Sequence, residues 1–372
     1  LEDYEKYLNA CVSASETFMN ESGYTLYKSG STPYRDLFAS INLQADEVIF
    51  GRDYEASLSV LHNVQNYENS TTMGRPGMNK KIVNSYLMAD GSRFTDKAGY
   101  ETMTFDQECQ NRDPRLAQTI RTPGYTRIGS TKKEAPNLAY TMTGYHLIKY
   151  SMTANYDEYN KSCNDIPLFR TAEVYLNFAE AKAELGTLKQ ADINKSIKLL
   201  RDRVGMTNLD MELANSKPDP YLISAATGYP NVKGANQGVI LEIRRERTIE
   251  LAMEGFRYYD IMRWKEGKLF ENDLLGIYVP GPGTYDLDKD GTDDVCFYVG
   301  TKPAGNVPLY LEIGEQIRLS NGESGYIICH SLITKKWNED RDYLYPVPIS
   351  ERTLSNGVIT QNPGWNDGLN FN

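Results

Sequence analysis

The stretch from Gln237 to Trp264 constrains the fold of this chain more than any other, because it combines a helical apolar pattern with a high density of charge. Apolar side chains recur there at spacings of three and four, which predicts a helix packed on more than one side. We expect Gly255 and Gly267 to break the stretch into two helices, 237–256 and 257–270. The apolar positions are Ile240, Ile243, Leu251, Met253, Phe256, Tyr259 and Ile261.

Charges of alternating sign follow the same stretch, and opposite charges stand three residues apart, the separation at which helix side chains meet. A group of carboxylates could supply a general acid and a general base. Arginines within helical reach keep carboxylates ionised, however, whereas a catalytic acid needs a raised pKa. We therefore expect a structural charge network, in which Glu246→Ala or Arg257→Ala weakens the fold without selectively abolishing ligand binding. The predicted pairs are Arg247/Glu250, Glu254/Arg257, Arg257/Asp260 and Asp260/Arg263.

Helical patterns also occur at residues 1–20, 166–186 and 191–205. The second of these is expected to begin after Asn164 and Asp165, with Pro167 in its first turn, where a missing N–H costs nothing. One face of this helix carries small residues at intervals of four, three and four, which lets a neighbouring helix approach closely. The residues of this face are Ala172, Leu176, Ala179 and Ala183.

Several stretches of the chain follow one another in a characteristic order. They are NRDPRLAQTI at 111–120, TGYHLIKY at 143–150, IPLFRTAEVYLNFAEAKAELG at 166–186 with LRDRVGM at 200–206, ERTIELAMEGFRYYDIMRWKEG at 246–267 and LYPVPISERTLSNGVITQNPGW at 344–365. In this order they resemble the SusD/RagB family, the surface lipoproteins that bind nutrients for TonB-dependent transporters in Bacteroidetes. The resemblance spans most of the chain from about residue 100 onward.

This resemblance implies a mostly α-helical fold, with a tetratricopeptide-like scaffold of helical pairs, long irregular loops and a few short strands. It implies a single domain over 1–372, with the scaffold at 1–50 and 165–270, variable ligand-facing loops at 51–164, and a turn- and strand-rich part at 271–372. Family members carry further helical sequence before the segment that this start resembles. We therefore expect the chain to be incomplete at its N-terminal end.

The implied function is that of a non-enzymatic glycan-binding protein, which captures oligo- or polysaccharide and delivers it to a SusC-like TonB-dependent transporter. The implied location is the extracellular face of the outer membrane, reached through a lipid anchor outside this chain. Peptide as the cargo of such a transporter is the alternative. A glycoside hydrolase is a third hypothesis from a different class of protein.

Candidate ligand contacts are aromatic side chains, because sugar rings stack on aromatic faces and asparagine, aspartate or arginine bonds their hydroxyls. The family resemblance places the ligand face in the variable loops, so six aromatic residues of 51–164 are candidates, together with one tryptophan nearer the C-terminus. For each of them burial in the core is the competing interpretation, since aromatic residues are mostly buried. The candidates are Tyr54, Tyr67, Tyr86, Phe94, Tyr100, Tyr125 and Trp337.

Residues 286–294 place oxygen-bearing side chains at alternate positions with Gly291 sixth, as in the first half of a calcium-binding loop. Position twelve is Phe297 instead of the usual glutamate, and flanking helices are not expected. We predict a structural calcium ion here, with a surface loop rich in Asx turns as the alternative. The predicted ligands are Asp286, Asp288, Asp290, the carbonyl of Thr292, and Asp294.

Other classes of function find little support in the sequence. The net charge of -10, without a basic stripe, argues against binding to a nucleic-acid backbone. The three histidines, His62, His146 and His330, are far apart and form no zinc motif. No nucleophile elbow, P-loop or dinucleotide fingerprint occurs in a suitable setting. No apolar run reaches the roughly 18 residues that cross a bilayer.

Overall fold

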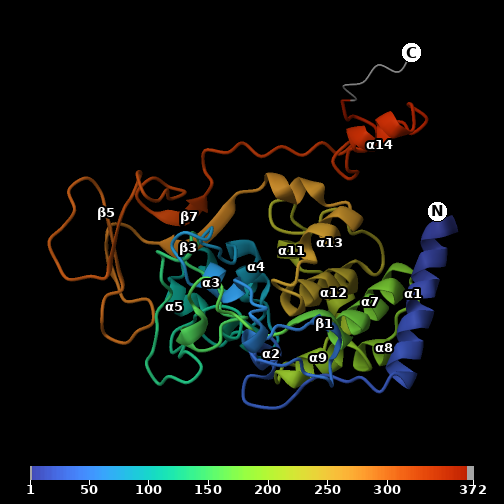
Figure 1. The fold of residues 1–372 in the computed structure, drawn as a ribbon, viewed down its shortest axis with the longest axis horizontal. Helices are drawn as coiled ribbons and strands as arrows, with labels where there is room; N and C mark the ends of the chain where they lie inside the picture. The colour runs from blue at the N-terminus through green and yellow to red at the C-terminus, as the bar shows by residue number, and fades with distance from the viewer. Residues whose placement is uncertain (1, 367–372) are drawn as a thin grey trace.

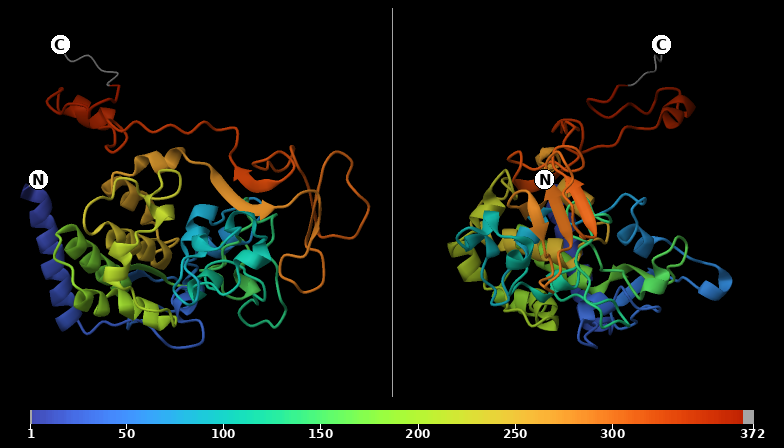
Figure 2. Two further views of the ribbon diagram at one scale, coloured as in Figure 1. Left: turned by 180° about the vertical axis from the view of Figure 1, so that it is seen from behind. Right: turned by 90° about the vertical axis from the view of Figure 1, so that its left-hand side faces the viewer.

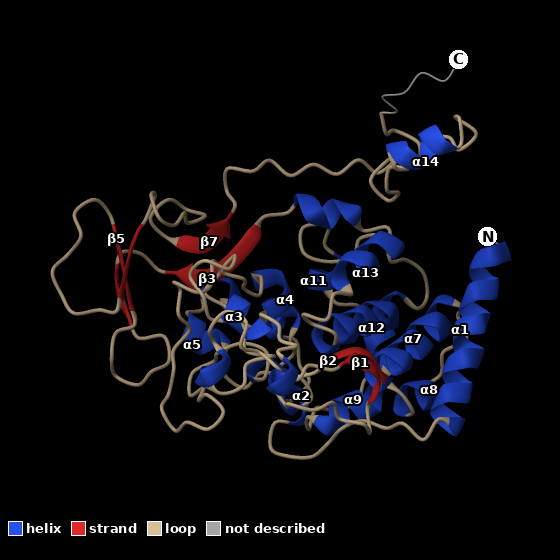
Figure 3. Ribbon diagram, in the orientation of Figure 1, coloured by secondary structure: helices blue, strands red, loops and turns tan. Residues whose placement is uncertain are grey.

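The computed structural model describes residues 2–366, and most of its regular structure is helical, with a few short strands (Figure 1, Figure 3). The expected mostly α-helical class is therefore confirmed. In the described part of the chain, no helix has both the length and the apolar character needed to span a membrane.

Two central helices, α7 (Thr171–Glu184) and α12 (Gln237–Glu250), pack against each other, and α1 (Glu2–Glu21) covers the outer side of α7 (Figure 1). The predicted small-residue face of α7 is buried, and the alanines on it let α12 approach closely. On α12 every residue from Gly238 to Glu250 is buried. The neighbouring helices are α8 (Gln190–Asn194), α9 (Ile197–Arg203), α10 (Met211–Ser216) and α11 (Pro220–Ile223).

The helix predicted from residue 166 begins five residues later than expected. Ile166–Arg170 instead form strand β2, which pairs antiparallel with β1 (Val48–Arg52). A ladder of two strands tolerates Pro167, because no third strand needs the N–H that proline lacks. The signal at 164–167 therefore marks a strand, and α7 begins at Thr171.

The long stretch that begins at Gln237 is divided, as expected, near Gly255. Helix α12 ends at Glu250, and the turn after it contains Met253 and Gly255 with φ angles of 65° and 86°. These are left-handed values that an α-helix cannot continue through. The chain then forms α13 (Arg257–Arg263) and the short 3₁₀ helix η5 (Gly267–Glu271).

Residues 51–164 are irregular, as predicted, but much of this region is buried. Its side chains supply a large share of the main apolar core, including Met78, Val83 and Phe105. Within this region Asp113 caps a short helix that begins at Pro114, and its carboxylate pairs with Arg115 at 2.7 Å. The short helices of this part and the one before it are α2 (Pro33–Asp36), η1 (Ala56–Leu58), α3 (Val64–Glu68), α4 (Lys80–Ser85), η2 (Phe94–Asp96), η3 (Tyr100–Thr102), α5 (Phe105–Glu108), α6 (Pro114–Ala117) and η4 (Ala154–Tyr156).

The C-terminal part contains the remaining strands, as its sequence predicts. Strand β3 pairs antiparallel with β7, while β5 lies between β4 and β6. After β7 the chain runs along one edge of the molecule to α14, which lies apart from the strands (Figure 1, and from behind in Figure 2). These elements are β3 (Leu274–Val279), β4 (Gly283–Tyr285), β5 (Val295–Tyr298), β6 (Leu309–Glu312), β7 (Gly325–Cys329) and α14 (Ile349–Leu354).

Candidate ligand-binding site

The charges of α12 form a buried network, but their partners come from other elements. The carboxylate of Glu250 accepts hydrogen bonds from Arg170 on β2 at 2.7 Å and from Arg203 on α9 at 2.5 Å. Arg115 on α6 reaches both Glu250, at 3.1 Å, and Glu246, at 2.5 Å. The network therefore joins elements that are distant in sequence, which is the structural role expected of these charges.

Arginine keeps these carboxylates ionised. Burial opposes the ionisation of Glu250, but Arg203, Arg170 and Arg115 outweigh it and hold the pKa of this carboxyl well below its usual range. The pKa of Glu246 is lowered in the same way by Arg115 and Arg201, against the effect of burial. A general acid needs the opposite shift, so the network does not supply one.

Three of the four pairs predicted at helical spacing are wrong, and the structure gives the reason. Only Asp260–Arg263 occurs among the ion pairs of residues 2–366. Glu254 lies in the turn between α12 and α13 and therefore shares no helix face with Arg257. Arg247 lies on α12 with Glu250, but it pairs with Asp260, thirteen residues away, at 2.8 Å.

Arg257 differs from the other arginines of this region, since it contacts no carboxylate of the described residues. Its Nη1 donates to the hydroxyl of Tyr229 at 2.7 Å and to that of Thr248 at 3.0 Å. The two acids that helical spacing offers it are taken by other cations: Glu254 by Lys149 and Arg170, and Asp260 by Arg247 and Arg263. The expectation that Arg257 belongs to the charge network is therefore corrected.

Aromatic side chains from α13, η5 and the segment after β7 form a continuous cluster next to Arg257. Ring centroids are 5.6 Å apart between Tyr258 and Phe270, 5.3 Å between Phe270 and Trp337, and 5.1 Å between Trp337 and Tyr343. Tyr259 and Tyr345 extend the cluster through Tyr258, at 5.4 and 6.5 Å. We call this set the aromatic cluster: Tyr258, Tyr259, Phe270, Trp337, Tyr343 and Tyr345.

The cluster combines a packed base with an exposed surface. At its base, residue 267 must be glycine, because a Cβ there would lie 2.0 Å from Cε2 of Trp337. The N–H of Gly267 also donates a hydrogen bond to the hydroxyl of Tyr343 at 2.9 Å. Tyr259 and Tyr345 remain 63% and 62% exposed, and Tyr258 37%. The exposed tyrosines thus present apolar faces and hydroxyls side by side, as a surface that binds sugars requires.

Two cavities adjoin the aromatic cluster, and they share Ile82, Thr248 and Arg257 in their linings. One, of about 350 Å³, is also lined by Tyr258. The other, of about 310 Å³, is also lined by Phe270. Volumes of this size lie at the lower end of the range of small-ligand sites. The cluster and the cavities together form the candidate ligand-binding site.

Of the aromatic residues singled out from the sequence, only Trp337 lies in this cluster. Tyr86 and Phe94 are 0% and 1% exposed, and Tyr125 is buried as well, so their rings are part of the interior and offer a ligand no face. Tyr125 packs there against the guanidinium groups of Arg35 and Arg121.

The other three candidates are accessible but separate from the cluster. Tyr67 is exposed. Tyr54 is half-buried against His62, with ring centroids 4.3 Å apart. Tyr100 packs on Phe94, at 5.8 Å, and on Tyr221. Their roles as ligand contacts stay predictions.

One sequence signal could have found the cluster. Tyr258 and Tyr259 are consecutive on a helix, and consecutive helical side chains point about 100° apart, so both cannot face one narrow core. The packing of Tyr258 with Phe270 and Trp337 depends on how the C-terminal segment folds. This segment has no hydrophobic periodicity from which its position could be predicted.

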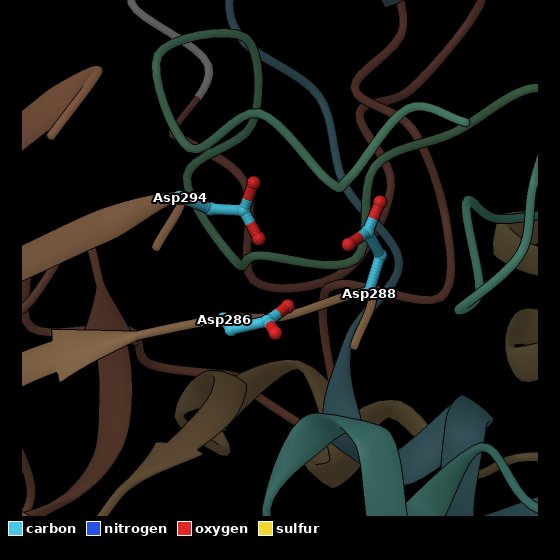
Figure 4. A group of neighbouring side chains, drawn as sticks. All are labelled: Asp286, Asp288 and Asp294. Carbon is cyan, nitrogen blue, oxygen red and sulfur yellow. The ribbon is translucent and has the colours of Figure 1, made fainter. Parts of the chain in front are cut away.

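The predicted calcium loop is the turn between β4 and β5, and it brings three carboxylates together. Oxygens of Asp286, Asp288 and Asp294 lie within 4.8 Å of one another, and Figure 4 shows the three carboxylates turned toward a common space. The carboxylate of Asp290 is outside this group and accepts from the N–H of Thr292 at 2.8 Å. The triad could hold a metal ion, without Asp290 as a ligand.

The triad has the electrostatics of a site for a cation. Burial, together with repulsion from Asp288, Asp286 and Asp290, raises the pKa of Asp294 to about 6, and burial and the neighbouring aspartates raise the pKa of Asp288. Hard oxygen donors are the ligands that calcium prefers, although it takes six to eight of them. Three carboxylates therefore fit as part of a calcium shell that water and carbonyl oxygens would complete.

The comparisons with known proteins decide the family. The model of the SusD family matches residues 37–365. The chain belongs to the SusD family. The expectation from its five ordered stretches is thereby confirmed. SusD family proteins that bind glycans are non-catalytic, in agreement with the non-enzymatic role expected here.

Solved structures of SusD-like proteins share the fold. A SusD-like protein from Bacteroides fragilis aligns with 98% of the chain at 21% identity and a TM-score of 0.61, and the chain spans 62% of its length. A SusD-like carbohydrate binding protein from the same organism aligns with 94% of the chain at 21% identity and a TM-score of 0.57, with 61% of its own length covered. No curated protein matches the sequence.

Proposed function

We propose that this SusD family chain is a non-enzymatic glycan-binding protein, and that its ligand stacks on the aromatic cluster. The observation that carries the proposal is the cluster itself, with Tyr258, Tyr259 and Tyr345 exposed beside two cavities. The family membership supports it, and one structure with the same fold is described as a carbohydrate binding protein.

The proposed mechanism is stacking with hydrogen bonds at the ring edges. The C–H faces of a sugar pack on the electron-rich faces of the tyrosines, while their hydroxyls bond the sugar hydroxyls. The hydrogen bond with Tyr345, together with burial, raises the pKa of Tyr258 to about 12, so this hydroxyl keeps its proton at neutral pH. Because the rings are already packed on one another, little side-chain entropy is lost on binding.

The test is a binding screen with two single-site variants. The chain is screened against a panel of polysaccharides and against a peptide mixture, and affinity for the strongest glycan is measured by calorimetry. We expect Tyr259→Ala to weaken that affinity about tenfold or more, equivalent to about 1.4 kcal/mol. Tyr67→Ala, which removes an exposed tyrosine outside the cluster, serves as the control and should leave affinity within twofold.

Three results would refute parts of this proposal. Binding of peptides and of no glycan would favour the peptide hypothesis. Loss of affinity in Tyr67→Ala but not in Tyr259→Ala would place the ligand on residues 51–164. Release of shorter products from a bound oligosaccharide would identify a glycoside hydrolase.

The proposed biological setting is the cell surface, where the chain would pass glycan to a SusC-like TonB-dependent transporter. Membership of the SusD family supports this setting. The proposal predicts that the lipidated protein purifies from outer membranes together with such a transporter. Recovery of the protein without any transporter after gentle solubilisation would count against it.

We propose further that the Asp286–Asp288–Asp294 triad binds calcium as a structural ion. A ligand that binds only the native state raises its stability, so 1 mM Ca²⁺ should raise the melting temperature. Asp288→Asn should remove that increase, whereas Asp293→Asn, in an exposed residue of the same turn outside the triad, should keep it. An unchanged melting temperature in the presence of Ca²⁺ would exclude the site.

A further inference from the structure

The charged residues that line the smaller of the two cavities, of about 310 Å³, are all positive, among apolar and neutral polar side chains. Lys81, Arg257 and Lys335 line it, and no carboxylate does. The chain as a whole holds more acidic than basic residues, 50 against 40, so a lining without acid is not what its composition predicts. We call this space the cationic cavity.

Arg257, which lines both cavities, has a hydrogen-bonding edge that the described protein does not use. Its Nη1 is held by the hydroxyls of Tyr229 and Thr248, which also line the cavity. Its Nε and Nη2 make no hydrogen bond to any residue between 2 and 366, and neither is sealed from solvent. A guanidinium edge whose two nitrogens are both free to donate is the partner that a planar carboxylate binds in bidentate fashion.

The positive charges of the two lysines are also only weakly compensated by neighbouring groups. The Nζ of Lys81 makes no hydrogen bond with the described part of the chain, and burial lowers the pKa of this lysine to about 8, against the attraction of Asp273. Lys335 donates from Nζ to the carbonyl of Asn272 at 2.6 Å, and it lies 3.9 Å from the carboxylate of Asp273, which is 65% exposed. Exposed ion pairs of this kind compensate a charge weakly.

We propose that the cationic cavity binds the carboxylate of an acidic sugar, a uronate residue of the glycan that the aromatic cluster holds. This inference rests on the proposed glycan-binding function and names the class of sugar. Phe270 is both a wall of the cavity and a member of the aromatic cluster, so a uronate in the cavity can continue into sugar residues stacked outside. The small volume suits one sugar residue.

The same geometry predicts discrimination against neutral sugars. A neutral sugar in the cavity displaces water from three cations and offers them no charge in return. A site built for a charged or strongly hydrogen-bonding group rejects the analogue that lacks it, because its polar groups are then left unpaired. Glucose should therefore bind far more weakly than glucuronate, which differs from it by oxidation of C6.

The test uses glucuronate and glucose as paired probes in calorimetry on the full chain. We expect glucuronate to bind at least tenfold more tightly than glucose, and the preference to weaken with added salt. Arg257→Gln should remove the preference. Lys233→Gln, a loss of one exposed positive charge outside both cavities, should retain it.

Lys81→Gln is a second test variant, chosen because it should not disturb folding. The ammonium of Lys81 makes no hydrogen bond among residues 2–366 that the substitution would break. The substitution should reduce glucuronate affinity at an unchanged melting temperature. Equal affinity for the two probes, or a preference that survives both Arg257→Gln and Lys81→Gln, overturns the inference. Neutral oligosaccharides that bind the aromatic cluster in the same experiments would leave the proposed function standing, so the two failures are distinguishable.

Discussion

Glu68 is a fully buried carboxyl group that forms no ion pair with any residue of the described chain. Its oxygens accept from the hydroxyl of Ser151 at 2.6 Å and from the N–H of Tyr150 at 3.4 Å. Burial raises the pKa of this carboxyl to about 7, against the hydrogen bonds from Ser151 and Tyr150. The group therefore titrates near neutral pH in the native state, and it makes the stability of the fold depend on pH.

The sign of that dependence follows from linkage. Because the native pKa is above the unfolded value, the native state holds this proton to higher pH than the unfolded state does. The contribution of Glu68 to stability is complete below about pH 4.5 and is lost as pH rises to about 7. A shift from 4.5 to about 7 corresponds to roughly 3 kcal/mol at most.

We predict that Glu68→Gln, which keeps the shape of the protonated carboxyl, is more stable than the wild type at pH 8 by about 1–3 kcal/mol. At pH 4.5 the two proteins should differ by less than about 0.5 kcal/mol. Urea denaturation at the two pH values measures both differences. A variant that is destabilised equally at pH 4.5 and pH 8 would show that the pKa of Glu68 is not raised in the native state.

At the scale of single elements, α12 depends on the ion pairs that connect it to its neighbours. Replacing Glu250 by Gln leaves Arg170 and Arg203 buried with one carboxylate fewer between them. We predict that Glu250→Gln lowers the free energy of unfolding by about 3–5 kcal/mol, the usual cost of an uncompensated buried charge. Denaturation curves measure this loss.

The matched control for this prediction is Glu16→Gln. Glu16 lies on α1 and pairs with Lys195 at 3.2 Å, but the two side chains are 40% and 48% exposed. Loss of such a pair should cost less than about 1 kcal/mol. Similar losses in the two variants would mean that the buried network contributes no more than a surface pair.

The sequence predicted the elements better than their connections. The apolar and small-residue patterns identified α1, α7 and α12, because a helix face records its packing in spacing. The strand Ile166–Arg170 was missed, because a proline shortly after Asn164 and Asp165 is locally a helix-start signal. Residues 166–170 form a strand because they pair with β1, which lies far away in the sequence. The partners of Glu250 were missed because they lie on β2, α6 and α9, at separations that no local spacing encodes.

The candidate site was less predictable than the fold for the same reason. Trp337 was recognised as an aromatic residue, but its neighbours Phe270 and Tyr258 come from other elements. Tyr86 was a candidate although it is a core residue, since residue type alone does not distinguish a buried ring from an exposed one.

At the scale of the whole molecule, the main apolar core unites parts of the chain that the sequence separates. It contains Met78 and Leu116 from the irregular region, Ile249 from α12, and Ile277 and Ile327 from the strands. The buried charge network crosses the same boundary through Arg115, which binds Glu246 and Glu250. A second core lies wholly within the scaffold, around Leu241 and Trp264, but the main core is shared between the scaffold, the irregular region and the strands.

We therefore predict that the chain unfolds as a single domain, the organisation expected from its sequence. Loss of helical signal in far-ultraviolet circular dichroism and exposure of the buried Trp264 in fluorescence should follow one transition in urea. The variant Ile277→Ala, which opens a cavity in the shared core, should shift both transitions together and by the same free energy, about 2–5 kcal/mol. If Ile277→Ala moved one transition and left the other in place, the scaffold and the strand-rich part would be separate folding units.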